Sequence, residues 1–62
     1  MMNQLRKRRL ELGYTAIEMA TKIGVRESTL TKWERGESMP SGKYVRLIES
    51  AYVMGWHDLM GV

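Results

Sequence analysis

The chain has 62 residues with no cysteine and one histidine, and its ten Lys and Arg outnumber its seven Asp and Glu, giving a formal net charge of +3. One small domain of this length leaves little room for a catalytic cleft, and the lack of cysteine excludes disulfides and thiolate chemistry. His57 alone does not make a zinc site, and the sequence contains no Ser-His-Asp set and no membrane span of about 18 apolar residues.

The positive charge favours a polyanionic partner, although the same charge is ordinary for the surface of a soluble domain. No internal repeat, low-complexity tract or Gly/Ser linker divides the chain, so residues 1–62 are predicted to form a single domain. The N-terminal stretch MMNQLRKRR turns basic before any apolar run, which is not typical of a signal peptide. A cytoplasmic location is therefore expected.

The first helix is predicted over about residues 3–12, with Gly13 closing it in the left-handed conformation. Leu5 and Leu12 are expected to face inward, with Leu10 as a further candidate, and Tyr14 is expected to fold back after the helix end. Three cations of this helix are open to a solvated or an anion-binding role: Arg6, Lys7 and Arg8.

The second helix is predicted between Thr15 and Gly24. Thr15 and Glu18 have the spacing of a capping box, in which each side chain accepts a hydrogen bond from the other residue's amide. Gly24 stands where a left-handed residue ends a helix. Four apolar residues at helical spacing are expected to form the buried stripe: Ile17, Met19, Ala20 and Ile23.

A third helix is predicted to follow a tight turn and to end at Gly36. Val25 seats the turn, and Leu30 and Trp33 supply the buried face. Polar residues fall mostly on the opposite face: Arg26, Glu27, Ser28, Thr31, Lys32 and Arg35. Two short helices joined this way are typical of a helix-turn-helix, whose second helix lies in the major groove of DNA. The polar face offers the donors and acceptors that base edges and phosphates require.

The fourth helix is predicted over about residues 42–54, after Pro40 and with Ser41 as its N-cap. It carries more apolar residues than one face needs, in two adjacent stripes. The first comprises Val45, Ile48 and Tyr52, and the second Tyr44, Leu47, Ala51 and Met54. The surplus either widens the core contact or forms a partner surface, to which residues 56–60 would add.

These motifs occur in an order that resembles a known family. The sequence T-x-x-E-M-A from Thr15, the turn at Gly24, V-x-x-S-T-L-x-x-W-E-x-G from Val25, and Pro40 before an amphipathic helix resemble the DNA-binding domain of lambdoid phage repressors, Cro proteins and bacterial XRE-type relatives. The resemblance covers about residues 5–59. It implies an all-α, five-helix, lambda-repressor-like domain whose second and third helices form the helix-turn-helix.

The resemblance also implies a structural ion pair. In the family, an Arg of the first helix pairs with a Glu near the end of the recognition helix, and Arg9 and Glu34 occupy those positions here. The alternative for Arg9 is a phosphate contact. Trp33 is expected to belong to the core rather than to act as a stacking platform.

Position by position, the base-reading residues of the family correspond to Arg26, Glu27, Ser28 and Lys32. Arg26 stands where relatives often have a Ser or Thr cap, and its charge opposes the positive end of the helix dipole. Either a DNA contact compensates for that penalty or the residue is a tolerated surface Arg. Glu27 is repelled by phosphate and is expected to act as a selector, accepting from cytosine N4 or anchoring Arg26.

Four residues are expected to contact the DNA backbone: Ala16, Thr31, Arg35 and Lys43. Ala16 replaces a Gln that grips a phosphate in many relatives, which leaves the amides and the dipole of the helix N-terminus for that contact. Thr31 is open to a base or a phosphate contact. The following loop is often basic in relatives, whereas Glu37 weakens that character here, and Arg46 is open to assisting or to being solvated.

Dimers of this family commonly pair through the C-terminal end. The expected interface residues are therefore Tyr44, Met54, Trp56, His57 and Met60. Relatives usually have Gly at the end of the fourth helix, where this chain has Val53 and defers the glycine to Gly55. The end of that helix, and with it the dimer geometry, stays open.

The resemblance predicts a sequence-specific double-stranded DNA-binding transcriptional regulator, Cro-like or repressor-type, that binds a pseudo-palindromic operator as a homodimer. An antitoxin or a restriction-modification controller of the same fold is one alternative. A protein-interaction module that uses the apolar surface of the fourth helix and the C-terminal segment is another. No enzymatic activity, cofactor, metal or small-molecule ligand is expected.

Overall fold

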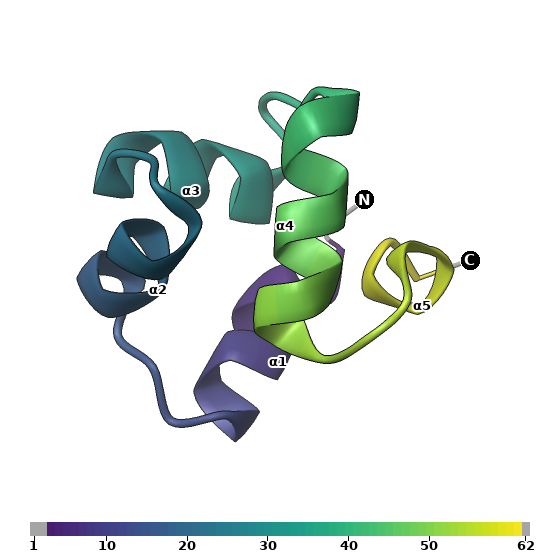
Figure 1. The fold of residues 1–62 in the computed structure, drawn as a ribbon, viewed down its shortest axis with the longest axis horizontal. Coiled ribbons are helices and arrows are strands. Elements are labelled where there is room, and N and C mark those ends of the chain that lie inside the picture. The colour runs from purple at the N-terminus through teal and green to yellow at the C-terminus, as the bar shows by residue number, and fades with distance from the viewer. Residues whose placement is uncertain (1–2, 62) are drawn as a thin grey trace.

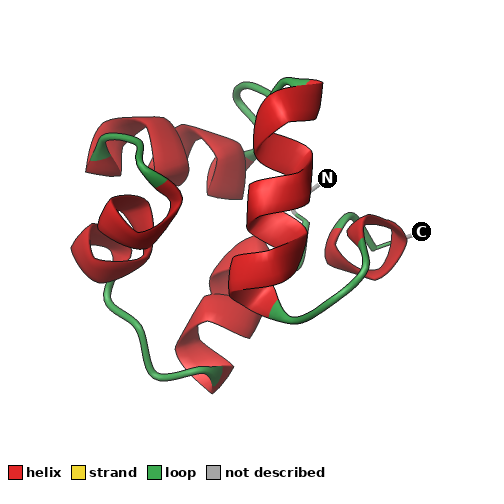
Figure 2. Ribbon diagram, viewed as in Figure 1, coloured by secondary structure: helices red, strands yellow, loops and turns green. Residues whose placement is uncertain are grey.

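A computed structural model of the chain describes residues 3–61. It contains α1 (Leu5–Glu11), α2 (Ala16–Ile23), α3 (Glu27–Arg35), α4 (Gly42–Tyr52) and α5 (Trp56–Leu59), and no strand within the described range. In Figure 1, α4 crosses in front of α1, with α2 and α3 on one side of it and α5 on the other. The loops that join the helices are short (Figure 2). The predicted all-α, five-helix fold is confirmed.

Local hydrogen bonds explain where the first two helices begin and end. The Asn3 side chain accepts from the Leu5 amide at 3.0 Å, and α1 begins at Leu5, two residues later than predicted. Gly13 follows in the left-handed region, at φ 85°. The predicted capping box of α2 is present: the Thr15 amide donates to Glu18 at 2.9 Å and the Glu18 amide donates to Thr15 Oγ1 at 3.1 Å. Thr15 and Glu18 are both exposed, so their two hydrogen bonds stabilise the start of α2 locally.

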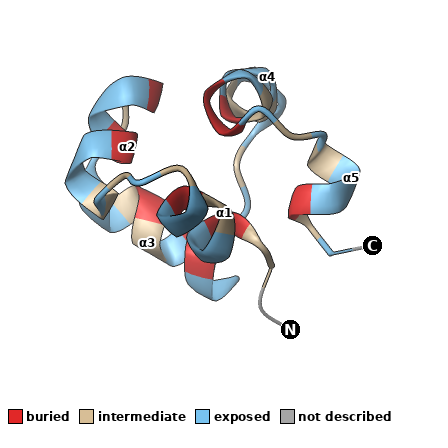
Figure 3. Cartoon of the chain, turned by 90° about the horizontal axis from the view of Figure 1, so that it is seen from below, coloured by how far each residue is buried: buried red, intermediate tan, exposed pale blue. Residues whose placement is uncertain are grey.

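The core lies where α1, α2, α3, α4 and α5 face one another, as the inward-facing buried residues in Figure 3 show. Its largest fully buried side chains are Leu5, Met19, Leu30, Ile48, Tyr52 and Leu59. Trp33 is 4% exposed, which confirms its predicted place in the core.

The prediction that Leu10 and Ile17 face inward is wrong, because Leu10 is 51% exposed and Ile17 is 61% exposed. The inward side of α1 follows Leu5 and Arg9, and Leu10 is about 100° around the helix from Arg9. Ile17 likewise lies off the buried side of α2, which is formed by Met19, Ala20 and Ile23.

The end of α4 differs from the predicted helix over 42–54. The helix stops at Tyr52, and Val53 adopts the left-handed region at φ 51° and ψ 48°. Arg8 stabilises this end, because its Nε donates to the Tyr52 carbonyl at 2.9 Å and its Nη2 donates to the Val53 carbonyl at 3.3 Å. Arg8 is therefore neither fully solvated nor free for an anion. Beyond the turn, Glu49 accepts from the Trp56 amide at 2.8 Å and holds the start of α5.

The apolar surplus of α4 mostly widens the core. Ala51 is buried, and Tyr44 and Met54 are half-buried and packed against the core cluster. Leu47 is 43% exposed and is thus the main residue of the second stripe that faces solvent. Ser41 is the N-cap residue as predicted, but its hydroxyl makes no capping hydrogen bond.

Candidate nucleic-acid interface

The helix α3 has one buried and one exposed face. Leu30, Trp33 and Glu34 are its buried residues. The predicted base-reading residues are all exposed: Arg26, Glu27, Ser28 and Lys32. Arg26 is the N-cap residue and makes no side-chain capping bond, because a guanidinium has no acceptor for the helix amides. The four residues are thus exposed from the N-cap of α3 to its last turn, where Lys32 lies.

The turn before α3 fixes how that helix follows α2 (Figure 1). Gly24 ends α2 at φ 93° and ψ 30°, a conformation that favours glycine. The amides of Gly24 and Val25 both donate to the Ala20 carbonyl, at 2.8 and 2.9 Å. Val25 is half-buried against the core cluster, which seats the turn as predicted.

A buried ion pair anchors the far side of α3. Arg9 Nε donates to Glu34 Oε2 at 2.7 Å and Arg9 Nη2 donates to Glu34 Oε1 at 3.2 Å, so the contact is bidentate. Arg9 Nη1 also donates to the Tyr14 carbonyl at 3.0 Å. The hydrogen bond to Glu34 raises the pKa of Arg9 above its ordinary value, against the opposing effect of burial. The pair predicted from the resemblance is present, and Arg9 is not available to a phosphate.

A hydrogen bond also joins the residues just before α1 to α3, because Asn3 Nδ2 donates to the Trp33 carbonyl at 2.8 Å. Tyr52 packs nearby with a buried hydroxyl that has no hydrogen-bond partner among the described residues. Burial raises the pKa of this phenol well above its usual range. Polar and apolar contacts thus hold the buried side of α3 against the domain, while its opposite side is exposed.

The predicted backbone contacts lie at both ends of the helix pair. Ala16 is the first residue of α2, whose first-turn amides have no intrahelical partners. The Glu18 carboxylate occupies part of that terminus, and the hydrogen bond from the Thr15 amide lowers its pKa. Thr31 is half-buried, and its hydroxyl donates to the Ser28 carbonyl at 3.1 Å.

At the end of α3, Arg35 Nη1 lies 3.6 Å from a carboxylate oxygen of Glu37. Lys43 is exposed at the start of α4, with its ammonium 5.4 Å from the ring centroid of Tyr44. Tyr44 in turn lies against Trp33, with ring centroids 5.6 Å apart. Both cations are thus exposed, and each already has a neighbour within this chain.

The residues predicted for a dimer interface divide into two groups. Tyr44, Met54, Trp56 and Met60 are half-buried and pack against the core of their own chain, whereas His57 is exposed. The largest exposed apolar side chains at this end are Leu47 and Val53, the latter 72% exposed. Leu47 belongs to the apolar stripe that the sequence offered as a possible partner surface, whereas Val53 was not named as an interface residue, although the glycine expected at position 53 marked a special backbone conformation.

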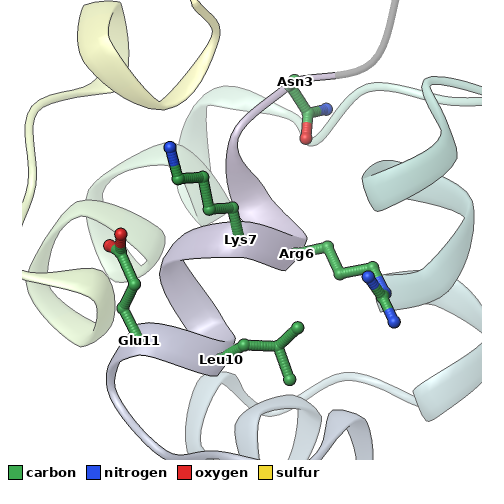
Figure 4. Close-up of a pocket in the computed structure, with 5 residues that line it drawn as sticks. All are labelled: Asn3, Arg6, Lys7, Leu10 and Glu11. Carbon is green, nitrogen blue, oxygen red and sulfur yellow. The ribbon is translucent and has the colours of Figure 1, made fainter.

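A shallow depression of about 530 Å³ lies along α1. Its lining residues are Asn3, Arg6, Lys7, Leu10 and Glu11. Figure 4 shows Arg6 and Lys7 pointing to different sides of the helix. Across residues 3–61 no group of three or more His, Cys, Asp or Glu side chains is placed to hold a metal ion. In the same range no helix has the length and apolar character needed to span a membrane.

Comparisons with solved structures find the same arrangement of helices. The P22 c2 repressor in complex with a synthetic operator has a TM-score of 0.87 at 24% identity, covering 94% of this chain and 88% of that one. The N-terminal DNA-binding domain of SinR from Bacillus subtilis has a TM-score of 0.80 at 28% identity, covering 95% and 87%. The clp gene regulator ClgR from C. glutamicum has a TM-score of 0.80 at 27% identity, covering 90% and 72%.

A search of curated proteins found no match for the chain. Residues 5–52 match the family described as Helix-turn-helix, and this range covers more than half of the chain. The chain therefore belongs to the helix-turn-helix family, in the XRE type that includes Cro- and C1-like repressors, and its fold is that of DNA-binding transcriptional regulators.

Proposed function

We propose that this chain is a sequence-specific transcriptional regulator that reads double-stranded DNA with the exposed face of α3. The observation that carries the proposal is the asymmetry of that helix. Its back is buried and anchored by the Arg9–Glu34 pair, while four polar residues between its N-cap and its last turn are exposed. A rigid helix with a free polar face has the form that major-groove recognition requires. The structurally similar P22 c2 repressor was solved with a synthetic operator.

The four exposed residues have complementary chemistry toward base edges. Arg26 carries the guanidinium that binds guanine O6 and N7 in the commonest specific contact, and Lys32 supplies a second cation for the same acceptors. The Glu27 carboxylate can accept a hydrogen bond from cytosine N4, and it disfavours binding wherever it would lie against a phosphate. The Ser28 hydroxyl can donate to or accept from a base edge. This set favours an operator with G·C pairs under the start of α3.

Backbone contacts would come from both ends of the helix pair. The first-turn amides of α2, which starts at Ala16, would donate to a DNA phosphate, and the positive end of the helix dipole would attract it. On the other side, Arg35 and Lys43 bring two exposed cations to the loop between α3 and α4. Thr31 would join them only by redirecting its hydroxyl from the Ser28 carbonyl.

Two copies on a pseudo-palindromic operator would double the contacts of this small domain. Exposure supports His57, Leu47 and Val53 as the residues that face a second copy. Tyr44, Met54, Trp56 and Met60 would contribute only their exposed edges, because they already pack against the core. The same packing weakens the alternative of a partner-binding module that uses those side chains.

The test is a binding titration on DNA from upstream of the chain's own gene, against random duplex, at about 50 and 200 mM salt. A preference of about a hundredfold or more with a steep salt dependence is expected. Lys32→Ala should reduce that preference. Lys7→Ala should leave it unchanged, because Lys7 is likewise an exposed lysine but lies on α1 and not on the proposed DNA-reading helix α3. Equal, weak binding to both duplexes, or equal effects of the two variants, would overturn the proposal.

A further inference from the structure

Arg35, one of the proposed phosphate contacts, already has an acidic neighbour. Its Nη1 lies 3.6 Å from Glu37 Oε2, and the two side chains are 67% and 53% exposed. An ion pair this exposed contributes little to folding, since solvent screens the charges and the side chains lose entropy. Its effect on an incoming anion is a separate matter, because the guanidinium that meets Glu37 is the one a DNA phosphate would need.

The backbone holds Glu37 where this contact forms. Gly36 ends α3 in the left-handed region at φ 76°, and the Glu37 amide donates to the Lys32 carbonyl at 2.9 Å. This hydrogen bond fastens Glu37 to the last turn of the helix that carries Arg35. The Glu37 main chain is therefore held at the α3 terminus, which places its exposed carboxylate within reach of Arg35.

Carboxylate and phosphate oxygens bind a guanidinium in the same planar geometry, so they compete for it. We propose that Glu37 is an intramolecular competitor of phosphate for Arg35 and limits how tightly this face holds the DNA backbone. The inference rests on the proposed function. Because Glu37 acts on a backbone contact, it lowers binding to operator and to random DNA by the same factor, and Arg26, Glu27 and Ser28 at the other end of α3 are unaffected.

The test compares Glu37→Gln with a matched variant elsewhere. Glu11→Gln removes the same charge from another exposed pair, since Glu11 lies 3.5 Å from Arg8 on α1. Binding of each chain to random-sequence duplex is titrated at about 50 and 200 mM salt. Glu37→Gln should bind about two- to fivefold more tightly at the lower salt, with a smaller gain at the higher, and Glu11→Gln should stay close to the original affinity.

Arg35→Ala and the double variant Arg35→Ala/Glu37→Gln complete the cycle, and circular dichroism confirms that each variant is folded. The gain from Glu37→Gln should disappear when Arg35 is absent. An equal gain in the Arg35→Ala background, or an equal gain from Glu11→Gln, would show a general charge effect and overturn the inference. Measurable binding by the original chain with no gain from Glu37→Gln would overturn it as well. If none of the chains binds DNA, the proposed function fails together with it.

Discussion

Val53 is the one described residue other than glycine with a positive φ, and replacing it should stabilise the domain. The left-handed conformation brings a Cβ close to the following carbonyl and disfavours an L-residue by about 1–2 kcal/mol. A β-branched side chain is among the poorest choices for it, whereas Asn adopts it readily. Val53→Asn should therefore relieve the strain and keep the chain path.

The expected gain follows from the exposure of the side chain. Val53 is 72% exposed, so the substitution gives up only the small apolar burial that remains, worth roughly 0.5 kcal/mol. Arg8 contacts the carbonyls of Tyr52 and Val53 rather than the valine side chain, so these bonds persist. The net effect is a rise of about 1 kcal/mol in the free energy of unfolding, or about 4–8 °C in Tm for a domain of this size.

The assay is thermal and urea unfolding followed by circular dichroism, with Val53→Thr as the matched control. Thr preserves the β-branched shape and hence the strain, so its Tm should stay near that of the original chain. A Val53→Asn variant no more stable than Val53→Thr would show that the left-handed backbone at this position carries no strain to relieve.

Four further predictions concern contacts within the fold. Glu34→Ala should lower the free energy of unfolding by about 3–5 kcal/mol, because it strands the buried Arg9 charge; a urea titration that finds less than about 1 kcal/mol would contradict this. Thr15→Ala should lower it by about 0.5–2 kcal/mol through loss of the α2 cap, as measured by the same titration. The pKa of Glu18 lies below its ordinary 4.5 in the folded chain, so its contribution is present above that pH and is lost as the pH falls through the lower folded pKa. The stability difference between the original chain and Glu18→Gln should accordingly vanish in acid, and a pH-independent difference would count against the capping box. Arg8→Ala should lower the free energy of unfolding by about 1 kcal/mol because two carbonyls at the end of α4 lose their donor. An unchanged free energy of unfolding in the same urea titration would contradict this.

Local patterns in the sequence predicted the parts of the fold that depend on near neighbours. The capping box of Thr15 and Glu18 and the left-handed end at Gly24 need only a few residues of context, and both are present. The Arg9–Glu34 pair joins distant residues and came from the family resemblance instead. Leu10 was misplaced because a helix as short as α1 has too few residues to define its apolar side by periodicity.

Contacts from side chains to distant backbone groups left no signal in the sequence. Arg8 and Glu49 each bind main-chain atoms across the α4–α5 turn, and any residue type can supply a carbonyl or an amide. For the candidate site, amphipathic spacing predicted that Arg26 and Lys32 are exposed, and the structure agrees. Which base each of them reads remains a prediction, since that depends on a DNA sequence that the protein does not encode.

Whether the exposed face of α3 binds DNA can be tested by mapping amide chemical-shift changes. A labelled sample is titrated with the duplex that binds most tightly. We expect the largest changes at residues 26–35 and at the start of α2, with residues 6–11 of α1 little affected. Changes concentrated on α1, or on α4 and α5, with α3 unperturbed would contradict this expectation.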